Sequence, residues 1–146
     1  MSDLQRAKDC AAKMYASDRA SKSLGIEIEI PEAGSAVASM YVRQEMVNGF
    51  DICHGGMVFT LADTAFAFAC NAYDEVTVAG SGNIEFLRPA TRGEHLRAIA
   101  LEVHRGRKQG VYKVEVRNQD DKLVALFQGR SVSRGEALLD KQQSDT

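Results

Sequence analysis

The spacing of hydrophobic and polar positions changes several times along the chain and predicts an order of helices and strands. Near the N-terminus the apolar residues recur at helical intervals and form one stripe, made of Leu4, Ala7, Ala11 and Met14. Ser2 followed by Gln5 has the spacing of a capping box, so residues 2–17 are predicted to form an amphipathic helix. Nothing in this helix suggests chemistry, and packing on the body of the protein is its expected role.

Strand patterns dominate much of the remaining chain. After Gly25, isoleucine and glutamate alternate up to Ile30, which is typical of a half-buried strand, and small or β-branched residues at 35–42 follow a turn. Beyond residue 75 only strand patterns occur, separated by polar turns at 105–110 and 119–122. The expected strands in this part are 76–87, 96–104, 111–118 and 123–132.

One segment, residues 56–73, is apolar on nearly all sides. It contains no proline, and no glycine after Gly56, so it predicts a helix of about 17 residues, roughly 26 Å long. Because such a helix must be buried on most sides, a strongly curved antiparallel sheet is expected to wrap around it. The sequence therefore predicts an α+β fold with an extra N-terminal helix within residues 1–20. Residues 1–146 are expected to form this single domain, ending in a polar, flexible tail at 134–146.

Composition narrows the classes of function. The 146 residues include 18 basic and 20 acidic side chains, and the net charge of −2 gives no reason to expect a nucleic-acid partner. The three cysteines form no Cys-x-x-Cys pair, which indicates neither a zinc site nor a disulfide framework and favours a reducing compartment. Residues 1–20 are polar, and the apolar stretch 57–70 is too short to span a bilayer, so a cytoplasmic location and no membrane partner are expected.

Two glycines, Gly55 and Gly56, stand at the start of the long apolar segment. The start of a helix carries unpaired backbone N–H groups and the positive end of the helix dipole. Without a Cβ, glycine lets a ligand oxygen approach these donors closely, which would suit a negative charge that develops on oxygen in a transition state. Taken alone, however, the two glycines are explained more simply by a tight turn that begins the helix.

Asp63 lies inside the apolar segment, where a carboxylate is unexpected. Ionised carboxylates are costly to bury, so one in such a place is usually functional or strongly paired. Thr60 and Thr64 flank it and form a small polar patch with it. The alternative is an aspartate that accepts hydrogen bonds from buried backbone or hydroxyl groups.

The spacing between Gly56 and Asp63 has a geometric consequence. Seven residues are close to two helical turns, so both residues face one side of the helix, about 10 Å apart along its axis. One small ligand group cannot contact both within one chain. A two-fold dimer with antiparallel central helices would bring Gly56 of one chain close to Asp63 of the other, and we therefore predict an active site shared by two chains.

The segment 53–72, which reads CHGGMVFTLADTAFAFACNA, resembles the signature helix of the PaaI-type hot-dog thioesterases. Segments 46–49, 84–89 and 124–130 are similar to that family as well, so the resemblance covers nearly the whole chain. It implies the hot-dog fold and an acyl-CoA thioesterase that hydrolyses phenylacetyl-CoA or hydroxyphenylacetyl-CoA in phenylacetate or aromatic degradation. It also implies a homotetramer, built as a dimer of dimers with active sites between subunits.

The resemblance further implies roles for single residues. Asp63 would be the catalytic carboxylate, either as general base on water or as direct nucleophile. The Gly56 N–H would polarise the thioester carbonyl. Asn48 would position the substrate or the attacking water, and His54 would brace the loop before the helix.

Substrate-binding candidates fall into several groups. Basic residues before Pro89 and in the turn 105–110 are candidates for the CoA phosphates, although a solvated hairpin explains the turn as well. Aromatic residues are candidates for the acyl pocket, although core packing is the alternative. Some relatives carry a serine where this chain has Ala79, and Ser81 is close but could face the other way. The whole set is Gly55, Phe50, Phe59, Thr60, Thr64, Ser81, Gly82, Asn83, Arg88, Arg105, Arg107 and Lys108.

The implied reaction needs only a base or nucleophile and an oxyanion site, because thiolate is a good leaving group. Neither a metal nor a cofactor is therefore expected, and CoA would be part of the substrate and the product. His54, His95 and His104 also lack the spacing of a zinc site.

Two other functions remain open at this stage. A hot-dog hydratase or dehydratase of acyl thioesters would need a histidine with an acidic residue, which His54 and Asp63 could supply. The two glycines and the nine-residue spacing match the thioesterase pattern better. A non-catalytic sensor would bind acyl-CoA without turnover, but the chain keeps the candidate carboxylate and no DNA-binding segment is recognised in it.

Overall fold

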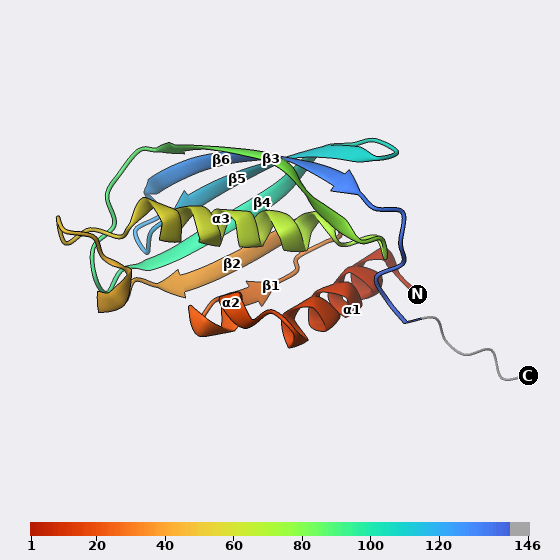
Figure 1. Cartoon of the computed structure of the whole chain (residues 1–146), viewed down its shortest axis with the longest axis horizontal. Coiled ribbons are helices and arrows are strands. Elements are labelled where there is room, and N and C mark those ends of the chain that lie inside the picture. The colour runs from red at the N-terminus through yellow and green to blue at the C-terminus, as the bar shows by residue number, and fades with distance from the viewer. Residues whose placement is uncertain (141–146) are drawn as a thin grey trace, which may run out of the picture.

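Six antiparallel strands form one curved sheet around a single long helix (Figure 1). The computed structural model describes residues 1–140. Its helices are α1 (Asp3–Ala16), α2 (Arg19–Ser23) and α3 (Gly55–Cys70), with a 3₁₀ turn, η1, at Gln44–Met46. Its strands are β1 (Glu27–Glu29), β2 (Ser35–Tyr41), β3 (Thr77–Phe86), β4 (His95–Arg105), β5 (Gln109–Arg117) and β6 (Leu123–Ser133), in the order β1-β2-β4-β5-β6-β3. The predicted α+β architecture with a central and an N-terminal helix is confirmed.

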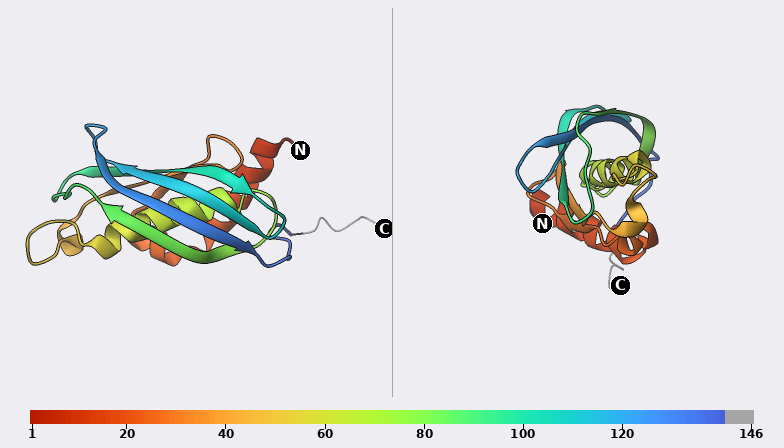
Figure 2. Two further views of the ribbon diagram at one scale, coloured as in Figure 1. Left: turned by 90° about the horizontal axis from the view of Figure 1, so that it is seen from above. Right: turned by 90° about the vertical axis from the view of Figure 1, so that its left-hand side faces the viewer.

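The sheet curls around α3, as the end-on view shows (Figure 2). Because α3 is apolar on nearly all sides, half of its residues are fully buried; these are Val58, Leu61, Ala62, Ala65, Phe66, Phe68, Ala69 and Cys70. The ring of Phe66 packs on Tyr112 of β5 and Phe127 of β6, with centroids 5.6 and 5.8 Å apart. Gly129 of β6 makes room for that ring, since a Cβ there would lie 2.6 Å from Cε2 of Phe66. Aromatic packing thus holds the helix against the sheet.

The helix α3 ends at Cys70, before the predicted end at residue 73. The side chain of Asn71 pairs with the backbone of Thr77, because its Nδ2 donates to the Thr77 carbonyl and its Oδ1 accepts from the Thr77 N–H, each at 2.8 Å. Asp74 then takes the left-handed conformation, with φ 55°. These two side-chain hydrogen bonds end the helix and direct the chain into β3. A hydrophobic pattern cannot predict them, because they depend on the conformation of one polar side chain.

The N-terminal helix α1 forms where the sequence predicts it, with half of the predicted capping box. Ser2 Oγ accepts from the Gln5 N–H at 3.0 Å, but the Gln5 side chain donates to Asp9 at 2.8 Å instead of returning to the Ser2 backbone. Its buried stripe is Ala7, Cys10 and Ala11. Within residues 1–140, no helix combines the length and the apolar character that crossing a membrane would require.

Residues 134–140, the start of the tail that the sequence predicts to be flexible, make contacts with the body of the protein. They are tied to the body by backbone hydrogen bonds of Val76 with Arg134 and Glu136, by N–H donation from Leu138 and Leu139 to Asp74 Oδ1, and by an ion pair of Asp140 with Lys13. A polar composition suggested fraying, yet the carboxylate of Asp74 holds two backbone amides. The prediction for residues 141–146 lies outside the described residues.

One side of α3 and one edge of the sheet lie open next to each other. β3 is the last strand of the sheet, and within residues 1–140 its outer edge has no partner strand. Residues 78–83 of β3 are all exposed. On α3, Gly56 is exposed and Thr60, Asp63 and Ala67 are half-buried, which leaves an incompletely covered face. An unpaired edge beside a partly apolar helix face is a surface that another chain could cover.

Candidate active site

The two glycines at the start of α3 differ in their hydrogen bonds. The Gly56 N–H donates to Nδ1 of His54 at 2.9 Å, so His54 is the N-cap of the helix. The Met57 N–H donates to the His54 carbonyl at 2.8 Å. The Gly55 N–H has no acceptor in residues 1–140. The structure therefore does not support Gly56 as the polarising donor, and Gly55 carries the free N–H at the positive end of the helix.

The loop before α3 is organised by Asn48. Its Oδ1 accepts from the N–H groups of Phe50 at 2.9 Å and Ile52 at 3.4 Å, and its own N–H donates to the Ile52 carbonyl at 2.8 Å. No acceptor for the Asn48 Nδ2 lies in the described part of the chain, so this group is available to a substrate or a water. Phe50 stands at the tip of the loop and is 85% exposed, so within one chain it does not form the acyl-pocket wall that the sequence predicts.

A cavity of about 390 Å³ lies at the N-terminal end of α3. Its lining brings together three of the predicted site residues, Asn48, Gly55 and Arg88. The other lining residues are Ile52, Cys53, Val58, Phe86, Leu87, Pro89, Ala90 and Val124. Sequence reasoning missed Phe86 and Leu87 as site residues, although they belong to the segment 84–89 that carried part of the family resemblance. Gly55, the residue with the free N–H, therefore lines a pocket of the size that small ligands occupy.

Asp63 is half-buried on the incompletely covered face of α3. Burial raises the pKa of its carboxyl above the ordinary value of 3.8. The neighbouring hydroxyls do not pair with it, because Thr60 Oγ1 donates to the Gly56 carbonyl at 2.8 Å and Thr64 Oγ1 donates to the Thr60 carbonyl at 2.6 Å. Within residues 1–140 the carboxylate has no hydrogen-bond partner, which removes the purely structural alternative for this chain and leaves a carboxylate that is free to act.

The strand β3 does not present the predicted polar residues to α3. The pairing with β6 shifts between Ala79 and Ser81, so Ala79 lies opposite Ser131 and Ser81 lies opposite Arg130. Ser131 is buried on the inner face of the sheet, and side chains alternate along a strand, so Ala79 faces α3 and Ser81 faces outward. Asn83, opposite Gln128, also faces outward, whereas Gly82 faces inward. The structure thus removes the side chains of Ser81 and Asn83 from the helix side.

Phe59 belongs to the core more than to a pocket. Its ring lies edge-on to Phe127, with centroids 5.4 Å apart, and a Cβ on Gly82 would meet it at 3.4 Å. The prediction that Phe59 lines the acyl pocket is therefore not supported, and core packing, the alternative, is what the structure contains.

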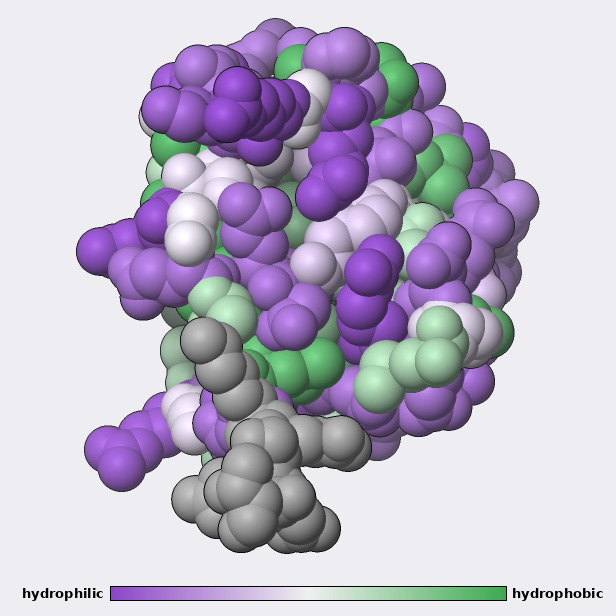
Figure 3. Space-filling view, turned by 90° about the vertical axis from the view of Figure 1, so that its right-hand side faces the viewer, coloured by the Kyte–Doolittle hydropathy of each residue, from purple (hydrophilic) through white to green (hydrophobic). Residues whose placement is uncertain are grey.

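The basic turn between β4 and β5 lies at the other end of α3. Cys70, the last residue of α3, shares a small cavity with Arg105, Arg107 and Lys108. A helix of 16 residues is about 24 Å long, so this turn is remote from Gly55 of the same chain. The end of the molecule that carries it is mainly hydrophilic (Figure 3).

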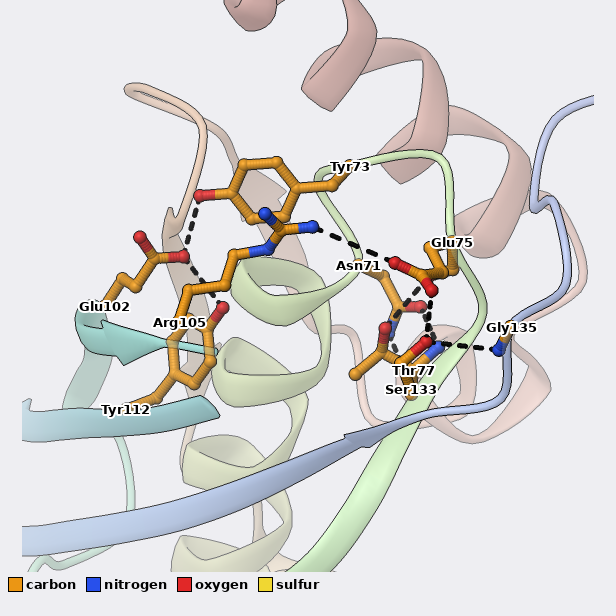
Figure 4. Close-up of polar contacts among 9 residues, drawn as sticks. All are labelled: Asn71, Tyr73, Glu75, Thr77, Glu102, Arg105, Tyr112, Ser133 and Gly135. Carbon is orange, nitrogen blue, oxygen red and sulfur yellow. Dashed lines mark hydrogen bonds and ion pairs between the residues drawn. The ribbon is translucent and has the colours of Figure 1, made fainter. Parts of the chain in front are cut away.

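Arg105 is held by its own chain and is not a free phosphate ligand (Figure 4). Its guanidinium stacks 3.8 Å from the centroid of the Tyr73 ring and lies 3.8 Å from the carboxylate of Glu75. Tyr73 and Tyr112 both donate to Oε1 of Glu102, at 2.7 and 2.9 Å. Burial and the hydrogen bond to Glu102 raise the pKa of Tyr73 to about 12, so this network stays protonated at the tyrosines and fixes the turn.

Arg107 and Lys108 have a different neighbourhood from Arg105. Both line a cavity of about 490 Å³ together with Arg130 of β6, which donates to Oε1 of Gln109 at 3.2 Å. Sequence reasoning did not assign Arg130 to this group, because β6 is distant from the turn along the chain. Three cationic groups around one cavity can bind phosphate oxygens.

Neither a reactive thiol at Cys53 or Cys70 nor a metal-binding cluster is found in the described range. Burial raises the pKa of Cys53 to about 11 and that of Cys70 to about 12, so these thiols are protonated and unreactive at neutral pH. Residues 1–140 contain no group of three or more His, Cys, Asp and Glu side chains that could hold a metal ion.

Comparisons with known proteins find a matching family model and several similar proteins. A model of the thioesterase superfamily matches residues 50–125. Acyl-coenzyme A thioesterase PaaI of Escherichia coli is 48% identical over 121 residues, which cover 83% of the chain and 86% of that protein. The structure of the E. coli PaaI protein from the phenylacetic acid degradation operon matches with a TM-score of 0.91 at 45% identity, over 93% of the chain and 99% of that structure. A Streptococcus mutans protein bound to acetyl-CoA matches with a TM-score of 0.73 at 25% identity, over 77% of the chain and 90% of that structure.

Proposed function

The chain belongs to the thioesterase superfamily and is an acyl-CoA thioesterase with the hot-dog fold, and we propose that its substrates are phenylacetyl-CoA and hydroxyphenylacetyl-CoA. The observation that carries the proposal is the free Gly55 N–H, which lies at a cavity of about 390 Å³ at the start of α3. A role in aromatic degradation is part of the same proposal, since the similar E. coli protein comes from the phenylacetic acid degradation operon.

In the proposed reaction the thioester carbonyl oxygen accepts a hydrogen bond from the Gly55 N–H. This donor and the helix dipole stabilise the negative charge that grows on the oxygen as the carbonyl carbon becomes tetrahedral. The Asn48 Nδ2, which is free in the described residues, orients the substrate or the attacking water. Collapse of the tetrahedral intermediate breaks the C–S bond, and CoA leaves as a thiolate that is then protonated.

Asp63 supplies the second group that the reaction needs. As a general base it removes a proton from water, which attacks the carbonyl carbon and forms the new C–O bond. As a nucleophile it forms a mixed anhydride that water then hydrolyses. A single turnover in ¹⁸O-labelled water tests the nucleophilic route, because label in the Asp63 carboxylate requires an anhydride that water opens at Cγ, whereas label in the product acid alone shows that water attacked the acyl carbon.

The site is proposed to form between two chains. Gly55 and Asp63 are eight positions apart on one helix, about 12 Å along its axis, so one thioester cannot reach both in the same chain. Two copies that pair along the open edge of β3, with their α3 helices antiparallel, place Gly55 of one chain near Asp63 of the other. Assembly of such dimers into a tetramer is part of the proposal.

The same antiparallel arrangement explains the position of the basic turn. The turn lies near the C-terminal end of α3, and that end of the second chain comes close to the N-terminal end of the first α3. Arg107, Lys108 and Arg130 would then bind the CoA phosphates while the acyl group lies in the cavity at Gly55. Neither a metal nor a cofactor is proposed, because an oxyanion donor, a carboxylate and a good leaving group are sufficient.

The CoA subsite has its own test. The double substitution Arg107→Ala and Lys108→Ala is expected to raise KM several-fold for CoA esters and to leave KM for a pantetheine ester unchanged, since pantetheine lacks the nucleotide phosphates. Lys113→Ala, an exposed lysine of β5, is the control. An equal effect of the double substitution on both esters would exclude a phosphate-binding role.

The function itself is tested by release of free thiol from a panel of CoA esters. The panel contains phenylacetyl-, hydroxyphenylacetyl-, benzoyl- and straight-chain acyl-CoA. We expect turnover to be fastest with the arylacetyl esters and Asp63→Asn to reduce kcat at least ~10²-fold, while Asp120→Asn in an exposed turn has no effect. Hydration of an enoyl-CoA without release of thiol, or tight binding without any turnover, would overturn the proposal.

A further inference from the structure

We propose that Phe86 determines the acyl specificity of this site, because its ring forms the wall against which an aromatic acyl group packs when its carbonyl accepts the Gly55 N–H. This inference rests on the proposed function and deepens it, since it names the side chain that selects arylacetyl over straight-chain esters. Phe86 is not among the site residues that the sequence predicts.

Phe86 is placed directly at the oxyanion donor. It is the last residue of β3 and lies opposite Ala125 of β6, which is fully buried, so its ring is on the inner face of the sheet. A Cβ built on Gly55 would lie 3.1 Å from Cζ and 3.4 Å from Cε1 of the Phe86 ring. The ring therefore occupies the space next to Gly55 that a side chain at position 55 would need.

The rest of the ring remains available to a ligand. Phe86 is 55% exposed although it lines the cavity at the start of α3. The apolar groups around it are aliphatic side chains such as Ile52, Val58 and Val124, and among the residues of 1–140 that line this cavity Phe86 is the only aromatic one. An aromatic ring that enters the cavity thus has one aromatic partner there, in offset or edge-to-face contact.

The covalent structure of the substrate fits this placement. In an arylacetyl thioester one methylene separates the carbonyl carbon from the aromatic ring, and this methylene lets the ring turn relative to the carbonyl. A carbonyl oxygen bound to the Gly55 N–H therefore keeps the aryl ring close to Phe86 and allows the two rings to adopt a favourable angle. A straight-chain acyl group at the same donor makes apolar contacts only, and a benzoyl ring is held coplanar with its carbonyl.

The test compares Phe86→Leu, Phe86→Tyr and Phe86→Ala with wild type on phenylacetyl-CoA and butyryl-CoA. Leucine keeps an apolar side chain without a ring, so Phe86→Leu is expected to lower kcat/KM for phenylacetyl-CoA roughly 3- to 10-fold and to leave butyryl-CoA nearly unchanged. Phe86→Tyr keeps the ring and should retain the preference. Tyr41→Leu is the matched control, since Tyr41 is an exposed aromatic residue on β2, outside this cavity.

Equal losses with both esters in Phe86→Leu would overturn the inference, because Phe86 would then be a wall without selectivity. Thermal unfolding of each variant identifies any that fails to fold, and Phe86→Leu with Phe86→Tyr is then sufficient without Phe86→Ala. If wild type releases no thiol from any ester, the proposed function fails. Calorimetric binding of the phenylethyl and butyl thioethers of CoA then decides the inference alone: a selective loss of the phenylethyl ligand in Phe86→Leu supports it, and no selective loss overturns it.

Discussion

At the scale of single residues, the two glycines at the start of α3 are not equivalent. His54 caps Gly56 through Nδ1 at 2.9 Å, and the N–H of Gly55 is left free at the edge of the cavity. The family resemblance assigned the donor role to Gly56, whose N–H donates to His54, whereas the donor proposed here is Gly55, one residue earlier. Which of two adjacent glycines is capped depends on the side-chain conformation of His54, and no pattern of residue types contains that information.

Gly55→Pro tests this donor with little disturbance of the helix. Gly55 is the first residue of α3, where proline is favoured, and His54 already has φ −56° and ψ 133°, which suits a residue before proline. Because proline has no N–H, we expect kcat for phenylacetyl-CoA to fall by about 10² to 10³. Gly55→Ala is the control, since it crowds the Phe86 ring but keeps the donor. If both variants lose the same activity, crowding and not the missing N–H is the cause.

Asp63 carries a prediction about the pH dependence of activity. Burial raises the pKa of its carboxyl above 3.8, and either catalytic role requires the ionised form. The kcat of the wild type should therefore fall as the pH drops through this raised pKa, at a higher pH than an exposed aspartate would give. A pH profile of thiol release that stays flat down to pH 4 would contradict the role of Asp63.

The same raised pKa predicts a trade-off between stability and activity. A carboxyl that binds its proton more tightly in the folded state contributes stability below the unfolded pKa, and this contribution is lost as the pH rises through the folded pKa. Asp63→Asn should therefore resist denaturant better than wild type at pH 7, and the difference should disappear near pH 4. Guanidinium unfolding at both pH values measures it, with Asp120→Asn as the exposed control. A variant less stable than wild type at pH 7 would show that Asp63 is needed structurally.

At the scale of elements, the pair formed by α3 and β3 decides what the site can contain. The hydrophobic pattern predicted both elements to within a few residues, because an apolar helix and alternating strands leave clear periodicities. It did not predict the register shift between Ala79 and Ser81, which turns Ser81 away from the helix. It also did not predict the end of α3, where the side chain of Asn71 pairs with the Thr77 backbone.

The open face of α3 predicts how the chain associates. Ala67 lies one turn after Asp63 on this face and is half-buried. Ala67→Lys places a charge between two antiparallel helices. We therefore expect the dissociation constant of the dimer to rise ~10²-fold and the activity to follow the fraction of protein that is dimeric. Gln128→Lys, on the exposed outer face of β6, is the control for added charge. Unchanged assembly of Ala67→Lys in analytical ultracentrifugation would exclude this interface.

At the scale of the whole molecule, the sequence predicted the architecture but not the distances between its functional parts. The curved sheet around one helix followed from the single apolar segment, because that helix needs cover on most sides and most of the other segments have strand patterns. Gly55 and the basic turn lie at opposite ends of α3, and only the folded structure shows this arrangement, because the sequence pattern does not place the turn relative to the helix. The polar composition of the tail also gave no indication of the hydrogen bonds that residues 134–140 make with Asp74 and Val76.

These distances make the shared site the central claim, and mixed dimers test it directly. Asp63→Asn and Gly55→Pro are each expected to lose at least ~10²-fold in kcat when present alone. In a heterodimer of the two variants, one of the two shared sites combines an intact Gly55 from one chain with an intact Asp63 from the other. We therefore predict that co-expressed, doubly tagged heterodimers recover about half of the wild-type rate of thiol release per dimer, since one of two sites is whole. Heterodimers that are no more active than either parent would place both groups in one chain and contradict the account.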